Sequence, residues 1–464
     1  MINLILLATI NLELNIRFPQ LYQFFQAISA LSVLLLINYA SAQCLTGNDN
    51  PMMMYPTSKT ALIDARFGFA LDSLKKASMI ESNDNIFFSP HSLHQALTLA
   101  YFGSRTTTEE SLKRALFRDL IAYRFFQLNG SSSYEYRSAN RLWITDMKKL
   151  RECMFDFFGD QLVKTNFRAD PIGVRNTIND WVSNMTKGQI RDLLSPDAID
   201  ENTDLVLANA VYFKGLWQSR FEPTNSKRDL FYSSGSQNAM VTFMRQKGNF
   251  NYMVSEELGA HILELPYKGE EISMYILLPP FATARSMNSG NQMPADRDGI
   301  RQVLERISTE KGSQELRELL DGGMPPREVE VSLPRFEMEK ELPMGQLLNA
   351  LGAGEIMVPN GADLRGFLAD GEQGLHLGDA IHRARIEVNE EGTTAAAATA
   401  IFTFRSSRPS EPAIFNANHP FVYFIYDKPL IKNNSYVFCN ALRENLFISY
   451  FHQKSNEHAF YVRK

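Results

Sequence analysis

The order of helical and strand patterns predicts an α+β fold for this chain. Segments with apolar residues at helical spacing dominate residues 60–186, whereas most strand patterns follow residue 205. Some strand patterns are continuously apolar and others alternate strictly, which indicates mixed strand pairing. No long Pro-rich, Gly/Ser-rich or like-charged linker divides the 464 residues, so we expect one large domain.

The expected helices lie mainly in the first half of the chain. Apolar residues recur at helical spacing in 60–78, and hydroxyl and acidic residues open the amphipathic pattern of 106–118. Two further helices are expected at 92–101 and 172–186. The exception in this half is 85–90, a short apolar strand pattern that stops at a proline.

The expected strands differ in how they are buried. Residues 205–213 and 272–278 are almost entirely apolar, as in strands that are covered on both faces. Residues 328–333 and 379–390 alternate between polar and apolar side chains, as in strands covered on one face. A polar stretch at 282–299 is expected to be a surface insertion.

The composition describes a chain that can fill a large core and carries little net charge. Hydrophobic residues make up 44% and aromatic residues 11% of the sequence, which is sufficient for a core of that size. The formal net charge of −5 gives no basic surface for nucleic acid. No apolar run away from the N-terminus reaches the ~20 residues that cross a bilayer, so no membrane partner is expected.

The N-terminus has the pattern of a secretion signal. Residues 28–39 form an apolar stretch of suitable length, and Ala40-Ser41-Ala42 follows it as a small-x-small cleavage pattern. Cleavage would give a signal peptide at 1–42, an N-terminal extension at 43–59 and a secreted, extracellular protein. An uncleaved anchor and a start placed too early are the alternatives, and secretion is favoured.

Glycosylation sites are expected, whereas metal, cofactor and catalytic sites are not. Three N-x-[ST] sequons fit a secretory route: Asn129, Asn184 and Asn433. With only three cysteines we expect no disulfide framework and an odd thiol. His91 and His94 lack acidic or cysteine partners nearby in sequence, so they are read as ordinary helix residues. The G-x-S-x-G, Walker, H-E-x-x-H and dinucleotide-binding patterns are absent, so we expect neither an enzyme nor a cofactor.

One segment combines conflicting local preferences. The alternating strand has Ala380, His382, Ala384, Ile386 and Val388 on one face and Arg383, Arg385, Glu387 and Asn389 on the other. It runs into 391–400, where alanines favour helix, threonines favour strand and a glycine disfavours both. Such conflict often marks a functional element. Either the segment leaves a loop to enter a gap between strands, which small side chains permit, or it is an alanine-rich surface loop.

This segment and several others resemble the serpin family of protease inhibitors. The matching runs occur in the expected order across residues 60–427: 85–92 (NIFFSPHS), 179–182 with Thr186 and Gly188, 209–217 with Phe221, 362–366, His382, 390–399 and 418–421. The resemblance implies a serpin fold, an α+β domain at 60–450 with about nine helices around three β-sheets and an exposed reactive loop at about 390–412. A monomer is expected.

The resemblance implies that the chain inhibits a serine protease. The protease would cleave the reactive loop, form an acyl-enzyme and be trapped as the freed loop enters the large sheet. Thr393, Ala395, Ala397 and Thr399 would point inward in the new strand. The implied hinge consists of Glu390, Glu391, Gly392, Thr393, Thr394, Ala395, Ala396, Ala397, Ala398 and Thr399.

Other residues are implied to hold the sheet closed or to mark its upper end. Asn209 and His382, with Ser89 and Ser92, resemble the family's shutter, although a pair of satisfied core polar groups is the plain alternative. Arg335 aligns with a position that pairs with Glu390 near Trp217.

The bond to be cleaved follows from family spacing. Counting from Gly392 places cleavage between Ser406 and Ser407, whereas Arg405-Ser406, one residue earlier, suits a trypsin-like protease by charge. We therefore expect a trypsin-like or elastase-like serine protease as the partner, held in a covalent complex.

Two regions leave alternatives open. A basic cluster at Lys113, Arg114, Arg118 and Arg124 suggests either a glycosaminoglycan site or, as favoured, a solvated helix face. After residue 427 the chain departs from the family: 445–450 lacks a glycine expected there, and 451–464 is a polar tail. Either a longer loop precedes a divergent strand, or this end is aberrant.

The overall pattern most resembles arthropod extracellular serpins. By analogy, this suggests a regulator of an extracellular proteolytic cascade such as one of innate immunity. A non-inhibitory serpin acting as a carrier, chaperone or storage protein is the alternative.

Overall fold

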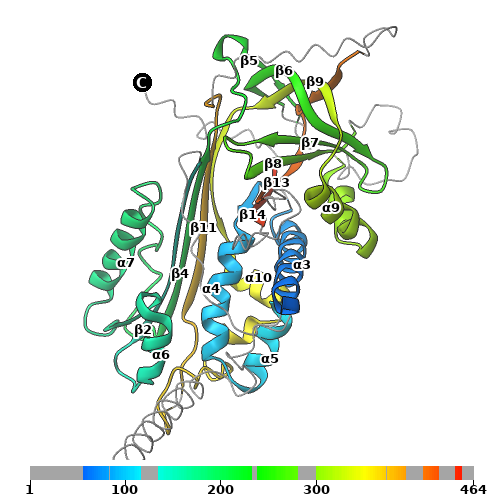
Figure 1. Cartoon of the computed structure of the whole chain (residues 1–464). Helices are drawn as coiled ribbons and strands as arrows, with labels where there is room; N and C mark the ends of the chain where they lie inside the picture. The colour runs from blue at the N-terminus through cyan, green and yellow to red at the C-terminus, as the bar shows by residue number, and fades with distance from the viewer. Residues whose placement is uncertain are drawn as a thin grey trace, which may run out of the picture.

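The computed structural model describes residues 56–82, 84–116, 134–232, 238–280, 299–372, 374–392, 411–427 and 445–451. These residues form eight α-helices and fourteen strands (Figure 1). The helices are α3 (Pro56–Ile80), α4 (Pro90–Gly103), α5 (Thr106–Ala115), α6 (Glu152–Phe158), α7 (Pro171–Met185), α8 (Ile300–Ile307), α9 (Glu310–Gly322) and α10 (Met344–Ala350).

A five-stranded sheet runs through the middle of the molecule. Its order is β10 (Phe336–Leu342), β11 (Asp379–Val388), β4 (Leu205–Gly215), β2 (Tyr134–Thr145) and β3 (Leu162–Thr165). α7 covers one face of this sheet and α4 lies against the other (Figure 1). Because both faces are covered, all but one of the eleven residues of β4 are buried.

The second sheet has nine strands. Its order is β1 (Ile86–Phe88), β14 (Asn445–Phe451), β13 (Phe421–Asp427), β8 (Ile272–Leu278), β7 (Ala260–Pro266), β6 (Ala239–Ser255), β9 (Pro326–Pro334) and β12 (Ala413–Asn416), with β5 (Lys227–Phe231) also paired to β6. The 17-residue β6 pairs with β9 through 243–251 and with β7 through 252–255. This long strand therefore connects two sheets, which with the five-stranded sheet make up the three expected β-sheets.

The last described strand fills an internal place in that sheet. β14 lies between β13 and β1 and is antiparallel to both. Residues 428–444, which precede it, lie outside the described residues, as does 452–464. A final strand at 445–451 was one of the two alternatives that the sequence left open.

Local sequence explains where the two helices on the five-stranded sheet begin. In α4, Pro90 occupies the first turn and the Ser89 hydroxyl accepts the Ser92 N–H. In α7, Pro171 follows Asp170, whose carboxylate accepts the Gly173 N–H. These caps fix where each helix begins against the sheet.

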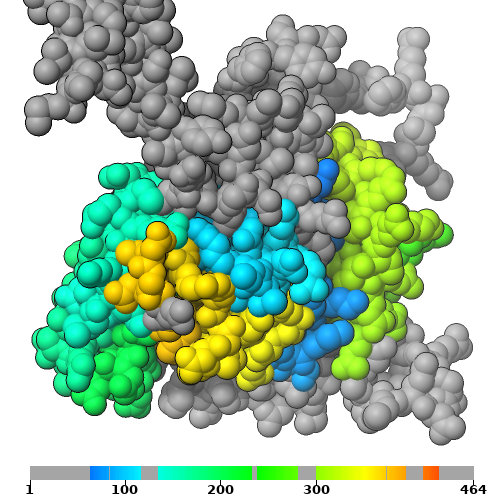
Figure 2. Space-filling view, turned by 90° about the horizontal axis from the view of Figure 1, so that it is seen from below, coloured from blue at the N-terminus to red at the C-terminus, as the bar shows by residue number. Residues whose placement is uncertain are grey.

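The lower end of the molecule is closed by the segment that follows α10. Figure 2 shows this segment, coloured yellow to orange, beside the cyan α4–α5 corner. Arg105 N–H donates to Asp363 O at 2.8 Å and Gly366 N–H to Gly103 O at 2.9 Å. A Cβ on Gly366 would lie 2.5 Å from the Gly103 carbonyl, so this close approach requires glycine.

One cysteine of the described residues is oxidised. Cys153 in α6 is disulfide-bonded, and a single bond is compatible with the prediction of no disulfide framework and one odd thiol among three cysteines. The other two cysteines, Cys44 and Cys439, lie outside the described residues. A low cysteine count excludes a dense framework but not a single bond.

Candidate functional site

The centre of the five-stranded sheet contains one parallel pair of strands that are far apart in sequence. β11 pairs with β4 from Asp379 opposite Val206 to Glu387 opposite Lys214. Their outer neighbours, β10 and β2, are antiparallel to them. We call the β4–β11 boundary the seam. A strand that entered the seam from the upper end of β11 would run antiparallel to both neighbours.

His382 of β11 lies at the centre of a buried polar network. It is fully buried, and this burial lowers its pKa to about 3, so the ring is neutral. The Ser89 N–H donates to its Nε2 at 3.1 Å, so Nε2 carries no proton. The proton is therefore on Nδ1, which donates to the Asn209 side-chain oxygen across the seam.

Asn209 extends this network from β4 to α4 and β2. Its amide donates to Ser92 Oγ at 2.8 Å and to the side-chain oxygen of Asn140. Ser92 Oγ also lies 3.0 Å from Ser138 Oγ. Ser89, Ser92, Asn209 and His382, which the sequence had singled out, thus meet in one place. Asn140 and Ser138 of β2 had not been singled out, because polar residues on a half-buried strand carry no distinguishing signal.

Trp217 closes the upper end of the seam. Its ring stacks on Tyr267 with centroids 4.6 Å apart and an interplanar angle of 9°. Its indole N–H donates to the Asn389 carbonyl at 2.7 Å, and its backbone N–H donates to Glu391 O at 3.0 Å. Trp217 also forms an isolated parallel bridge with Gly392. The first hinge residues therefore leave the sheet beside this indole.

Charged residues surround the same point. The Arg335 guanidinium lies 3.5 Å from the Glu390 carboxylate, which also accepts the Ser226 hydroxyl at 2.8 Å. Lys214 of β4 lies 2.9 Å from Glu387 and 3.0 Å from Glu391. The Lys214 contacts connect β4 to β11 and the hinge, so they cross the seam.

Gly392 is tightly enclosed. A Cβ at this position would lie 2.6 Å from the Trp217 carbonyl and 2.8 Å from Arg220 Cβ. Any other side chain would displace the hinge from the top of β4. The remaining hinge residues, 393–399, and the cleavage candidates, Arg405, Ser406 and Ser407, lie outside the described residues.

The candidate glycosylation sites and the basic cluster lie partly inside and partly outside the described residues. Asn184 is exposed at the end of α7, whereas Asn129 and Asn433 lie outside the described residues. Lys113 and Arg114 lie on α5, and their two partners in the basic cluster lie outside that part of the chain. In the described ranges, His, Cys, Asp and Glu form no group of three that could hold a metal. No helix in those ranges is long and apolar enough to cross a membrane.

Comparison with known proteins identifies the family. A family model described as Serpin (serine protease inhibitor) matches residues 64–441. The chain is 36% identical over 388 residues to Serine protease inhibitor 88Ea of Drosophila melanogaster, covering 78% of this chain and 86% of that protein. It is 33% identical over 366 residues to Antithrombin-III of Homo sapiens, covering 75% and 74%.

The solved structures agree on the fold. A tumour suppressing serpin aligns with a TM-score of 0.68 at 23% identity, covering 85% of this chain and 99% of the other. The chain therefore belongs to the serpin family, and its fold is the serpin fold, as the motifs had led us to expect. Serine protease inhibition is the activity that the family description carries, and the relatives Serine protease inhibitor 88Ea and Antithrombin-III are inhibitors and not enzymes.

Proposed function

We propose that this chain is a secreted suicide inhibitor of a serine protease, which acts by loop cleavage, acyl-enzyme trapping and insertion of the loop into the seam. The observation that carries the proposal is the parallel β4–β11 pair with the hinge at its upper end. A chain that turns back after β11 runs antiparallel to both strands. Insertion thus replaces one parallel ladder with two antiparallel ladders, which are the more stable kind per residue.

The length and composition of the segment support insertion. Residues 393–406 comprise 14 residues, which span ~45 Å when extended at ~3.3 Å per residue. That exceeds the length of β4, which has 11 residues. The segment 393–400 contains only threonine and alanine, so it can enter the sheet without the clashes that large side chains cause.

We assign roles to the described residues on this basis. Glu390, Glu391 and Gly392 begin the hinge at the top of the sheet. The network of Ser89, Ser92, Asn209 and His382 holds the seam closed until cleavage. Contacts across the seam must break for a strand to enter, and the proposal requires that the two antiparallel ladders compensate for their loss.

The finer features of the proposal come from the sequence and the relatives. Cleavage after Arg405 or Ser406 would select a trypsin-like or elastase-like protease. The pattern at 1–42, the exposed Asn184 sequon and the similarity to Antithrombin-III and Serine protease inhibitor 88Ea support a secreted, glycosylated monomer that restrains an extracellular cascade. A glycosaminoglycan at the α5 cluster is not part of the proposal.

The test is incubation of the purified mature chain with trypsin and, separately, with elastase. We expect an SDS-stable complex, with mass spectrometry locating the adduct at Arg405 or Ser406. Thr393→Arg is the informative variant, because it places a charge on the inward face and should convert the chain into a substrate. Thr394→Arg, on the outward face, is its matched control and should retain the complex.

Two results would contradict the proposed mechanism. Clean cleavage of the unmodified chain by proteases that stay fully active would exclude the inhibitory mechanism and leave a non-inhibitory serpin. Complex formation by both hinge variants would show that inward burial of Thr393 is not required, and the insertion step would be wrong.

A further inference from the structure

The segment that joins α7 to β4, residues 186–204, lies on the outer face of the five-stranded sheet, and we call it the linker. Its side chains Ile190, Leu193 and Leu194 belong to an apolar cluster whose other members come mostly from α7, β2 and β4, with Ile381 as the one member from β11. Asn179 of α7 exchanges two hydrogen bonds with the Leu194 backbone, at 2.8 and 3.1 Å. The Thr186 hydroxyl accepts the Ile190 N–H at 3.1 Å. The linker is therefore fixed mainly to the β4 side of the seam.

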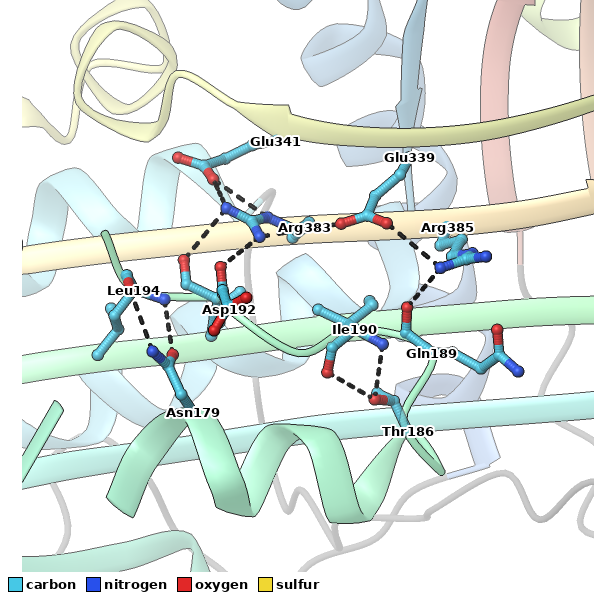
Figure 3. Close-up of polar contacts among 11 residues, drawn as sticks. Asn179, Thr186, Gln189, Ile190, Asp192, Leu194, Glu339, Glu341, Arg383 and Arg385 are labelled. Carbon is cyan, nitrogen blue, oxygen red and sulfur yellow. Dashed lines mark hydrogen bonds and ion pairs between the residues drawn. The ribbon is translucent and has the colours of Figure 1, made fainter. Parts of the chain in front are cut away.

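Two arginines of β11 bind the linker from the other side of the seam (Figure 3). Arg385 Nη1 donates to the Gln189 carbonyl at 2.7 Å. Arg383 donates to the Leu193 carbonyl at 3.3 Å and to the Asp192 carbonyl. The two side chains are only 20% and 27% exposed, so water competes weakly for these donors. We call these three hydrogen bonds the arginine bridge.

Three glutamates of β10 hold the two guanidinium groups in place. Arg383 Nε lies 3.2 Å from Glu341, to which Nη2 also donates, and the Arg383 guanidinium lies 3.8 Å from Glu339. Arg385 lies 3.6 Å from Glu339 and also pairs with Glu337. Because β11 is the one partner of β10 among the described strands of this sheet, the glutamates move with β11 when the seam opens. Of the contacts that these two arginines make, those to the linker must therefore break when the seam opens.

We infer that the arginine bridge sets the rate at which the seam opens. A strand that enters the seam moves β11 away from β4 by about one strand spacing, ~4.8 Å. Hydrogen bonds of 2.7 and 3.3 Å to a segment fixed beside β4 cannot survive that displacement. Donors that carry a charge make the stronger hydrogen bonds, so breaking them adds to the barrier. An effect of the arginine bridge on inhibition rests on the proposed function, whereas its effect on the opening of the seam does not.

The test compares hydrogen–deuterium exchange in the full chain and a double variant, Arg383→Met with Arg385→Met. Methionine keeps an unbranched apolar side chain but removes the charge and the donors. We expect exchange of the linker amides and of the β4–β11 ladder to become roughly tenfold faster. Amides of β8 and β13 in the other sheet should not change, and they serve as the internal reference.

A matched control separates the arginine bridge from the loss of any surface arginine. Arg137 of β2 lies on the same sheet and pairs with Glu135 of its own strand at 3.1 Å, so it does not cross the seam. Arg137→Met should leave exchange at the seam unchanged. If the double variant folds poorly, Arg385→Met alone tests the same inference, with a smaller expected acceleration.

Equal exchange at the seam in the unmodified chain and the variants, or equal acceleration by Arg137→Met, would overturn the inference. Uptake of a synthetic peptide of residues 391–404 adds a second readout, and the double variant should take it up faster. If neither form takes up peptide while exchange still accelerates, the proposed insertion fails but the arginine bridge stands. If both forms take up peptide at the same rate, the bridge does not control opening.

Discussion

Replacing Asn209 with alanine should strongly destabilise the closed sheet. Asn209 is 1% exposed, and its side chain contacts His382, Ser92 and Asn140. Removing it deletes three polar contacts and leaves the His382 Nδ1–H without its acceptor in a site that water does not reach. A buried hydrogen bond contributes ~1 kcal/mol and an unsatisfied buried group costs ~1–3 kcal/mol. We therefore expect the free energy of unfolding to fall by about 4–6 kcal/mol.

Urea unfolding followed by circular dichroism measures this change. Asn202→Ala, at an exposed turn before β4, is the control and should change the free energy by less than ~0.5 kcal/mol. A double-mutant cycle of Asn209→Ala with His382→Ala should show a coupling energy of ~1–3 kcal/mol, because the two side chains bond directly. A loss below ~1 kcal/mol for Asn209→Ala, or no coupling, would refute the account of the network.

Three further predictions concern the same sheet. Burial lowers the pKa of His382 and His94 to about 3, so the free energy of unfolding should be greatest above pH ~6.5. It should fall by up to ~1.4 kcal/mol per histidine per pH unit towards pH 3. Equal stability to urea at pH 7 and pH 5 would contradict this prediction. Lys214→Gln removes two partly exposed ion pairs and should lower the free energy of unfolding by only ~0.5–1 kcal/mol, a difference that high salt should abolish. A loss of stability that does not depend on salt would show that the ion pairs are not its source. Gly392→Ala should lower the free energy of unfolding by ~1–3 kcal/mol and shift the fluorescence of the adjacent Trp217, because the added methyl group would clash with the Trp217 carbonyl. Unchanged fluorescence would mean that the hinge does not lie beside Trp217.

Much of the fold followed from periodicity alone. The apolar run at 272–278 coincides with β8, and the alternating run at 379–390 contains β11, with Arg383, Arg385 and Glu387 on the partly exposed face as expected. β2 was missed because its burial follows neither alternation nor a continuous apolar run. β6 was missed because it spans two layers, so the buried face changes along its length.

Less of the candidate site than of the fold could be predicted from the sequence. Asn209 and His382 are 173 positions apart, and only the resemblance to serpins indicated that they belong together. The arginine bridge could not be foreseen, because its acceptors are backbone carbonyls and carry no side-chain signal. Alternation along β11 gave the direction of the two arginines but not their partners.

The central claim, that the seam accepts the cleaved loop, is tested most directly by the thermal stability of the chain before and after cleavage. The loop is cut with a protease that the chain does not trap, and unfolding of both forms is followed by circular dichroism. Two antiparallel ladders in place of one parallel ladder should raise the unfolding midpoint of the cleaved form by roughly 10 °C or more. An unchanged or lower midpoint would mean that the loop does not enter the sheet, and the proposed mechanism would be wrong.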